Sequence, residues 1–296
     1  MEELYDVLEG KKTFISNLLD GRGSVQLVDV SPRMCPKGYG PEYLMVRAAR
    51  TSFGLGLKDP VTDAKLLRYL LVNYHTSPIE MGSVTFRLVL PKDIAVHFLR
   101  HRMCKVNMFS MRYAEVTEEE NFYDPTKYEH GIRTGTKLNQ QSSKDVEDET
   151  QKEKIREKME QANDLTRQIH GLYSEMIKLG LAKEIARFWL PCSEYTTLFY
   201  QMDLNNLMKM LTLRADDHSQ HETTVYAKAM LELIRPLFPT CVEVFEERTS
   251  GMGLLKSEID VILGNKDIKE ISSVSERAAL KQKLERLKIE IPKTDS

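Results

Sequence analysis

The feature that most constrains the fold is a change of hydrophobic period between residues 83 and 101. In the first half, apolar residues at every second position predict a half-buried strand: Val84, Phe86, Leu88 and Leu90. After Pro91 the apolar residues follow helical steps, and this leaves His97, Arg100 and His101 together on a separate face. The sequence therefore predicts a strand that runs directly into a helix carrying basic residues on one side.

Helix and strand patterns alternate irregularly along the rest of the chain. Helices are expected from Pro60 onward and over about Glu153–Leu179, Leu204–Leu213 and His218–Leu237, and a second strand over Tyr195–Met202. Because these patterns mix without regular β-α-β spacing, we expect an α+β fold. It would form one compact domain, with a mainly antiparallel sheet packed with helices. No glycine-rich loop typical of dinucleotide or triphosphate binding is present.

The least globular stretches of the sequence mark the expected domain limits. We expect a polar leader at residues 1–23 and a domain at 24–247 that carries a polar insertion at about 130–152. A charged C-terminal extension follows at 248–296. In it, Leu280 and Leu284 stand at helical spacing among charges, which predicts an amphipathic helix that packs on the body or on a neighbouring chain.

Composition excludes several classes of protein. The chain of 296 residues is 41% apolar, enough for a sizeable core. Its 42 basic and 44 acidic side chains give a net charge of −2, so an anion must be bound by a local cluster. The longest uncharged stretch, Tyr69–Ile79, is too short to span a bilayer, and the acidic N-terminus shows no secretory signal. Four scattered cysteines favour reduced thiols and a cytoplasmic protein.

The segment Arg100–Tyr113 is an unusually dense basic cluster. It holds three arginines, one lysine and one histidine within fourteen residues. Guanidinium groups are planar, permanently charged forks that suit phosphate groups. A solvated basic loop would explain the charges alone, but the interleaved apolar residues argue against it: Met103, Val106, Phe109 and Met111. The cluster therefore predicts an anion-binding site.

Within this cluster, Arg-His-Arg at 100–102 is followed after seven residues by Ser110. This spacing resembles the signature of the flavin-dependent thymidylate synthases. Further segments resemble that family in its own order: Arg47–Phe53, His75–Glu80, Glu184–Arg187, Leu213–Asp216, and His218 with Gln220 and Glu222. The similarity runs from about Gly23 to Phe245 and so covers most of the chain.

The resemblance implies a homotetrameric enzyme that reductively methylates dUMP to dTMP. Methylenetetrahydrofolate would supply the carbon, and FAD reduced by NADPH would supply the hydride. Arg214 is the expected catalytic residue, because its guanidinium would favour the N3-ionised form of the uracil ring and make C5 nucleophilic without a covalent bond to the enzyme.

The same resemblance assigns binding residues. Contacts to dUMP would come from two subunits: His97, Phe98, Leu99 and Arg100 from one, with Ser110, Met111, Arg112, Arg187 and Arg214. Contacts to FAD would be Ser77, Arg100, His101, Arg102, Met108, Asp203, Asn205, Lys209 and His218. His75 and Tyr113 are weaker candidates for the folate side, and a structural role explains a lone histidine such as His75 equally well.

Several positions depart from the usual family residues, and they gather around the expected flavin site. The family usually has Gln, Ser, Glu, Asn, Arg and Asn where this chain has His97, Lys105, Met108, Asp203, Asn205 and Lys209. The loss of one arginine at 205 is balanced by the lysines at 105 and 209. The local charge therefore stays positive, and anion binding is still expected.

Two other classes of function remain open at this point. A metallohydrolase could use His218 and Glu222, completed by His75 or His101, although helix capping accounts for the same acidic and histidine residues and we expect no metal. A nucleic-acid-binding module could use the basic cluster with Phe98, Phe109 and Tyr113 as stacking surfaces. The slightly acidic net charge counts against the second class.

A cysteine nucleophile is a further possibility, because Pro191-Cys192 resembles the Pro-Cys pair of the unrelated thymidylate synthases that use a thiolate. A nucleophilic cysteine needs nearby cations or a helix N-terminus to lower its pKa. Free cysteines are more often small buried hydrophobic residues, and this is the role we expect for Cys192. Ser110 is not expected to act as a nucleophile, since no base is fixed beside it.

Overall fold

The computed structural model describes residues 4–116, 121–135, 143–216, 219–250 and 253–290. The chain divides into two compact units, Met1–Thr240 and Cys241–Ser296. Among the described residues, no helix combines the length and the apolar character needed to cross a membrane.

A five-stranded sheet with the order β2-β3-β5-β9-β6 is the centre of the first unit, and every neighbouring pair in it is antiparallel. Its strands are β2 (Phe14–Leu18), β3 (Gly23–Ser31), β5 (Ser83–Pro91), β6 (Cys104–Met108) and β9 (Tyr195–Asp203). The expected α+β fold with an antiparallel sheet is thereby confirmed. The strand expected from residue 83 is β5, and its alternating apolar residues are buried.

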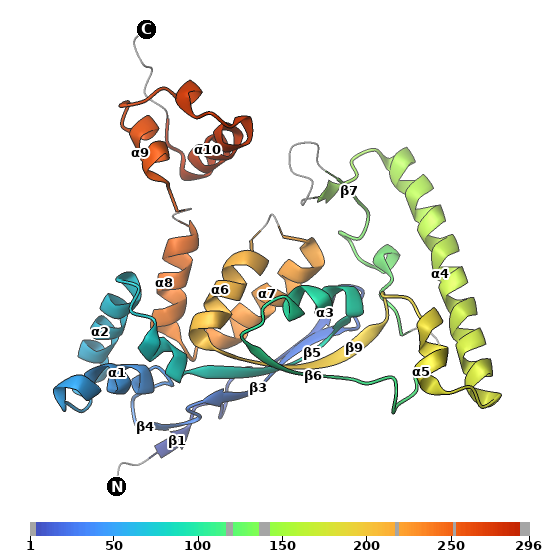
Figure 1. Ribbon diagram of the computed structural model, residues 1–296, viewed down its shortest axis with the longest axis horizontal. Coiled ribbons are helices and arrows are strands. Elements are labelled where there is room, and N and C mark those ends of the chain that lie inside the picture. Colours follow the sequence, from blue (N-terminus) through green and yellow to red (C-terminus); the bar gives the residue numbers. More distant parts are fainter. Residues whose placement is uncertain (1–3, 117–120, 136–142, 217–218, 251–252, 291–296) are drawn as a thin grey trace. The chain divides into compact units, whose positions relative to one another are not determined.

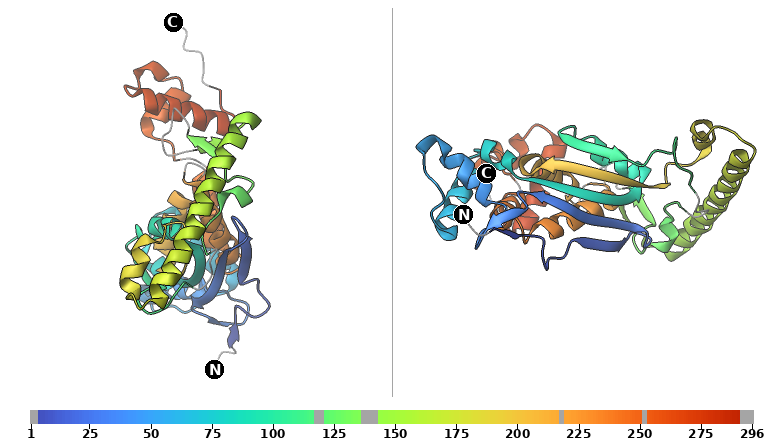
Figure 2. Two further views of the ribbon diagram at one scale, coloured as in Figure 1. Left: turned by 90° about the vertical axis from the view of Figure 1, so that its right-hand side faces the viewer. Right: turned by 90° about the horizontal axis from the view of Figure 1, so that it is seen from below.

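Helices cover one face of this sheet. They are α3 (Lys92–Leu99), α6 (Leu204–Arg214) and α7 (His221–Ile234), and they lie on the same side of the strands in Figure 1. In the view from below in Figure 2, the strands stand in front of these helices. The apolar side of β5 therefore faces the helices, while β6 keeps most of its residues exposed.

Further elements lie at the two ends of the sheet (Figure 1). At one end are α1 (Tyr43–Arg50), η1 (Thr51–Phe53), α2 (Pro60–Val72) and η2 (Ser77–Met81). At the other end are α4 (Glu149–Lys178), α5 (Lys183–Ala186) and η4 (Arg187–Trp189). Shorter elements are β1 (Leu4–Asp6), β4 (Met34–Pro36), η3 (Pro125–Lys127), β7 (Arg133–Gly135) and β8 (Ser143–Asp145). α8 (Pro239–Ser250) begins at the end of the first unit.

Side-chain caps determine where two of the expected helices begin. The Asp59 side chain accepts hydrogen bonds from the backbone N–H groups of Val61 and Thr62 at 3.1 and 3.0 Å, and α2 starts at the following proline. Asp148 caps α4 by accepting from the N–H of Gln151 at 3.0 Å. This cap starts α4 four residues earlier than its apolar pattern predicts.

The segment expected to be a leader contains structure of its own. β1 pairs with β4, and β2 pairs with β3 through Phe14 opposite Gln26 and Ile15 opposite Val25. Residues 1–23 are therefore part of the first compact unit. The polar insertion contains the hairpin of β7 and β8, and its residues 136–142 lie outside the described part of the chain.

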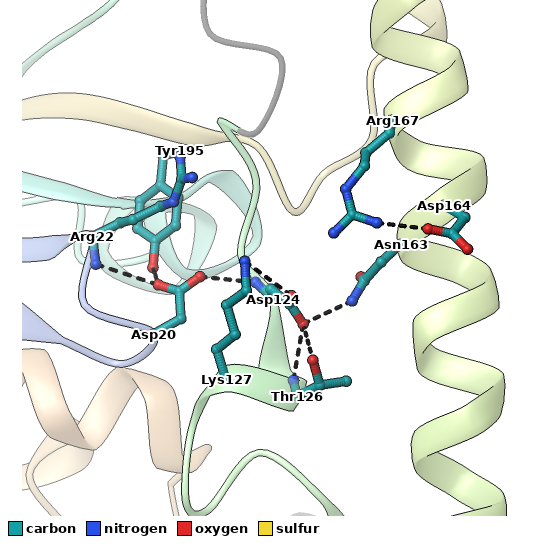
Figure 3. A network of polar contacts seen from close by, with 9 residues as sticks. All are labelled: Asp20, Arg22, Asp124, Thr126, Lys127, Asn163, Asp164, Arg167 and Tyr195. Carbon is teal, nitrogen blue, oxygen red and sulfur yellow. Dashed lines mark hydrogen bonds and ion pairs between the residues drawn. The ribbon is translucent and has the colours of Figure 1, made fainter.

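A polar network joins the α4 end to the sheet (Figure 3). The hydroxyl of Tyr195 on β9 donates to Asp20 Oδ1 at 2.6 Å, and the N–H of Asp124 donates to Asp20 Oδ2 at 2.9 Å. The amide of Asn163 on α4 donates to Asp124 Oδ1 at 2.7 Å. Because Asp124 and Asn163 are both buried, these bonds hold α4 in a fixed place relative to β9.

The second unit has a small core of its own. It contains α9 (Lys256–Ile262), η5 (Ile268–Glu270) and α10 (Val274–Leu287). The expected tail helix is confirmed as α10, but its buried Leu280 and Leu284 pack with Val261 and Ile271 inside the unit. The apolar side of α10 thus has partners within the extension itself.

Candidate functional site

The Arg-His-Arg segment lies in the turn between α3 and β6, next to the C-terminal end of α6. α3 buries Ile94, Ala95 and Phe98 in the core, and this turns its last residues toward α6. The guanidinium Nε of Arg214 donates a hydrogen bond to His101 Nε2 at 3.0 Å. The structure therefore brings the expected catalytic arginine into direct contact with the histidine of the motif.

This bond fixes the chemical state of His101. Because Nε2 accepts the hydrogen bond, the ring is neutral and carries its proton on Nδ1. Burial lowers the pKa of His101, and the positive charge of Arg214 lowers it further. Burial also lowers the pKa of Arg214, and Arg100 acts in the same direction. The neutral ring of His101 can thus accept the hydrogen bond from Arg214 and orient its guanidinium.

A cavity of about 600 Å³ opens beside this pair, large enough for a small organic ligand. Its lining residues are His97, Thr212, Leu213, Arg214, Asp216, Ser219 and Gln220. His97 Nδ1 lies 3.0 Å from the Thr223 hydroxyl on α7. Burial lowers the pKa of His97, as does Arg214, while Asp93 and Glu222 oppose the shift. The part of the cavity wall formed by His97 is therefore fixed by a bond between α3 and α7.

A second group of expected site residues lies in the turn after β6. Met111 is buried in a cluster with Tyr173, Ala186 and Leu190, which holds this turn against α4 and α5. The exposed Arg112 lies 3.4 Å from Glu184 (Nε to Oε2). Ser110 is half-buried at the start of the turn, and Arg187 is half-buried at the start of η4.

Lys92 is a member of this second group that sequence reasoning missed. Its Nζ lies 2.9 Å from the sulfur of Met111. Burial lowers the pKa of Lys92, and the charge of Arg187 acts the same way, while Glu194 opposes it. A lysine directly after a strand has no periodic signal, so only the tertiary structure could place it beside Arg187.

β6 separates the two groups within one chain. The Arg-His-Arg segment precedes this five-residue strand and Ser110 follows it. At a rise of about 3.3 Å per residue, the ends of such a strand lie roughly 17 Å apart. The structure therefore brings His97, His101 and Arg214 together but leaves Ser110 and Arg112 at a distance from them.

Two of the remaining expected flavin contacts have partners inside the chain. Asp203 caps α6 by accepting from the N–H of Asn206 at 2.9 Å. The buried Asn205 donates from Nδ2 to Glu80 Oε1 at 3.0 Å. These polar atoms are used in building the start of α6. The residues at 203 and 205, where the chain departs from the family it resembles, thus have local structural functions.

The other expected contacts are at the surface. Exposed positions of the flavin list are Ser77, Arg100, Arg102, Met108 and Lys209. His75 is exposed and stacks on Tyr69 with ring centroids 6.5 Å apart, and Tyr113 is exposed beside Arg112. His218 and its neighbour Asp217 lie outside the described residues.

The residues weighed for other chemistry are also placed. In the described part of the chain, no three His, Cys, Asp or Glu side chains are grouped to hold a metal ion. Glu222 instead pairs with Arg133, with Oε1 and Nη2 2.5 Å apart. Cys192 is exposed, so the expectation of a buried hydrophobic role was wrong; it stands in the loop before β9, where the chain leaves the core.

Comparisons with known proteins agree with this arrangement. Residues 35–240 match the family model described as thymidylate synthase complementing protein. A flavin-dependent thymidylate synthase from Dictyostelium discoideum is 34% identical over 284 residues, 94% of this chain and 91% of the relative. One from Wolbachia pipientis wMel is 36% identical over 208 residues, 70% and 71% of the two chains.

Solved structures give the same picture. A UMP/dUMP methylase, PolB from Streptomyces cacaoi, is 25% identical in structures bound with 5-Br UMP and 5-Br dUMP, with TM-scores of 0.59 and 0.60. These matches cover 76% of this chain and 94% and 95% of the solved chains. The α+β fold and the cavity lined by Arg214 therefore belong to a methyltransferase enzyme. The chain belongs to the family of flavin-dependent thymidylate synthases.

Proposed function

We propose that this enzyme methylates dUMP to dTMP, with methylenetetrahydrofolate as the carbon donor and FAD, reduced by NADPH, as the source of hydride. The observation that carries the proposal is the cavity in which Arg214 is oriented by His101. The methylase structures bound with halogenated UMP and dUMP support a pyrimidine nucleotide as the substrate.

Arg214 would act on the uracil ring. A guanidinium keeps its positive charge, so it stabilises negative charge that develops on the ring when N3 ionises. The C5 carbon then becomes the nucleophile toward the methylene group. Arg214 uses Nε for the hydrogen bond to His101, so its two Nη groups can face the substrate.

The exposed forks of Arg100 and Arg102 suit the diphosphate of FAD, since permanent charge and paired donors match phosphate oxygens. We propose that they hold the cofactor together with His101 and Ser77. Bound FAD supplies the hydride that completes the methyl group. Met108, Asp203, Asn205, Lys209 and His218 remain further candidates at the flavin, and His75 and Tyr113 at the folate.

We propose that a complete site needs a second copy of the chain, as in a homotetramer. Ser110 and Arg112 follow β6, whereas the Arg-His-Arg segment beside the cavity precedes it, and this separation supports a site to which two chains contribute. A neighbouring subunit would bring its own Ser110 group to this cavity. β6 and β9 expose apolar side chains that a neighbour could cover: Val106, Met108 and Phe199.

The purified protein's visible absorption tests this function. Protein loaded with FAD should show the flavin band, and NADPH should bleach it faster when dUMP is present. Addition of methylenetetrahydrofolate should then restore the oxidised band and yield dTMP. Protein that binds no flavin in calorimetry, or that forms no dTMP with all co-substrates present, would contradict the proposal. None of the four cysteines forms a disulfide in the described part of the chain, as a reducing cytoplasm favours, and we expect the enzyme to work there.

A further inference from the structure

The hairpin of β7 and β8, inserted between β6 and α4, is bonded to the first turn of α7. Arg133 begins β7, and its Nη2 lies 2.5 Å from Oε1 of Glu222 on α7. The two side chains are only 14% and 6% exposed. An ion pair with this little exposure is strongly destabilised when one partner is removed, because the other charge stays buried and uncompensated.

Both members of the pair have further bonds. Glu222 accepts from the Tyr123 hydroxyl at 3.3 Å and from Gln220 Nε2 at 3.1 Å. Arg133 donates from Nε to the Ser143 hydroxyl at 2.9 Å, and from Nη1 to the carbonyl of His130. Burial tends to raise the pKa of Glu222, but the hydrogen bond and charge of Arg133 hold it below its usual value. The carboxylate is therefore ionised and held at both oxygens.

The segment that leads into the hairpin makes a neighbouring contact with α7. The Tyr128 hydroxyl lies 2.7 Å from His221 Nε2, and the ring of His130 lies 5.3 Å from that of His221. His221 is half-buried and is the first residue of α7. Tyr128 in the segment before the hairpin and Arg133 in the hairpin thus contact two successive residues of this turn.

Gln220, the residue directly before the first turn of α7, forms part of the cavity wall. Gln220 lines the cavity and donates to Glu222, and Thr223 bonds to His97 on the same wall. Gln220 and Thr223 lie within two positions of Glu222 in the sequence, and His97 is bonded to Thr223. A displacement of Glu222 would therefore displace the Gln220 and His97 side of the cavity.

We propose that Arg133 and Glu222 are positioning residues for the nucleotide site: the hairpin fixes the first turn of α7, so that His97 and Gln220 face the nucleotide. This inference rests on the proposed function, since it takes dUMP as the ligand of the cavity. Neither residue contacts substrate in this assignment. A purely structural ion pair would change the thermal stability and leave the affinity for dUMP unaltered.

The test compares the parent protein with Arg133→Met, Glu222→Gln, the double variant, and Lys144→Met as the matched control. Lys144 lies on β8 of the same hairpin and is exposed, and its ammonium group pairs with the exposed Glu147. For each protein, loaded with FAD, we would measure KM for dUMP, kcat and the melting temperature. Calorimetry on the same FAD-loaded proteins would give the dissociation constant of dUMP.

Arg133→Met should raise KM and the dissociation constant for dUMP about tenfold, while kcat at saturation changes less than about threefold. The double variant should recover part of this loss, because the neutral amide that Glu222→Gln introduces leaves no buried charge unpaired, but the bond that fixes the first turn of α7 is still missing. Lys144→Met should match the parent. If Arg133→Met does not fold, Arg133→Lys keeps the charge but loses the bonds to Ser143 and His130, and should show an intermediate KM.

A different outcome overturns the inference. If Arg133→Met or Arg133→Lys lowers the melting temperature but binds dUMP as tightly as Lys144→Met does, the hairpin is only structural. If the parent protein itself neither binds nor methylates dUMP, the proposed function fails, and the inference fails with it. If the parent methylates dUMP and the variants bind dUMP as tightly as the parent, the proposed function stands and only the positioning role is refuted.

Discussion

The two groups of site residues differ in how they are held. Around Arg214, side chains bond to one another across elements: Arg214 to His101 from α6 to the α3–β6 turn, and His97 to Thr223 from α3 to α7. After β6, the backbone is fixed by the buried Met111, while the exposed Arg112 pairs with Glu184 and lies over the ring of Tyr113. Around Arg214, hydrogen bonds between buried or half-buried groups set the direction of the donors. After β6, an exposed guanidinium is held by surface contacts alone.

The largest effect should follow from Arg214→Ala. Removal of a preset charge that stabilises the transition state lowers kcat by about 10² to 10³ or more. Flavin content should stay at the parent level, because the arginines assigned to the diphosphate are untouched. Arg214→Lys keeps the charge but cannot both bond to His101 and face the ring, so it should remain strongly impaired. Rates of dTMP formation and absorbance of bound flavin check this; an active, flavin-replete alanine variant would refute the role.

A smaller effect is expected from Arg112→Ala in the second group. Loss of a charged hydrogen bond to a phosphate costs roughly 1.5–3 kcal/mol, about 10- to 100-fold in KM for dUMP, with kcat less affected. The half-buried Arg156 on α4, which pairs with Glu153, offers an arginine-to-alanine control away from the site.

The same variant distinguishes a shared site from a single-chain site. If subunits share the site, mixed assemblies of Arg112→Ala and Arg214→Ala chains contain some sites with neither change, and activity returns on mixing. Mixtures that stay as inactive as their components would contradict a site built from two chains.

The smallest effect concerns pH. The pKa of His101 is lowered by burial and by Arg214, so the native ring stays neutral below the usual histidine value of about 6.5. As the pH falls through the lowered pKa, His101 gains a proton, loses its bond to Arg214 and repels it. We expect kcat/KM to fall on the acid side. Stability should fall in the same range, starting at the usual value, because the unfolded chain binds the proton first.

Comparison of pH profiles for the parent and His101→Asn checks this expectation. The variant should lose about tenfold in kcat/KM near neutral pH and should lack the part of the acid limb that His101 causes. His97, whose pKa is also lowered, faces Arg214, Asp93, Glu222 and Thr223 and would keep its own titration. An acid limb unchanged in His101→Asn would assign the pH dependence to another group.

The fold was predictable where hydrophobic periods were strong. The strand from Ser83 and the helix after Pro91 followed from a change of period, and both are confirmed. The first residues of helices were harder to predict from the apolar pattern. α4 begins directly after the Asp148 cap, before the expected position, and α7 begins at His221, after the expected position. The first 23 residues carry too little apolar pattern to show that β2 joins the sheet.

The chemistry of the site was predictable in kind but not in geometry. Arginine forks near a helix end indicated an anion, and resemblance to a family indicated which one. The bond between Arg214 and His101 joins residues 113 positions apart, and no local pattern encodes it. Arg133 and Glu222 are likewise distant in sequence, and the exposure of Cys192 depends on where a loop leaves the core.

The place of β6 at the edge of the sheet has a consequence for solubility. Strand edges with free backbone groups attract strands of other molecules, and natural proteins oppose this with charged side chains, lysine above all. Lys105 lies near the middle of β6, opposite Gln201 on β9, and is exposed. Lys105, which adds positive charge near the expected cofactor site, therefore also opposes the addition of strands from other molecules at this edge.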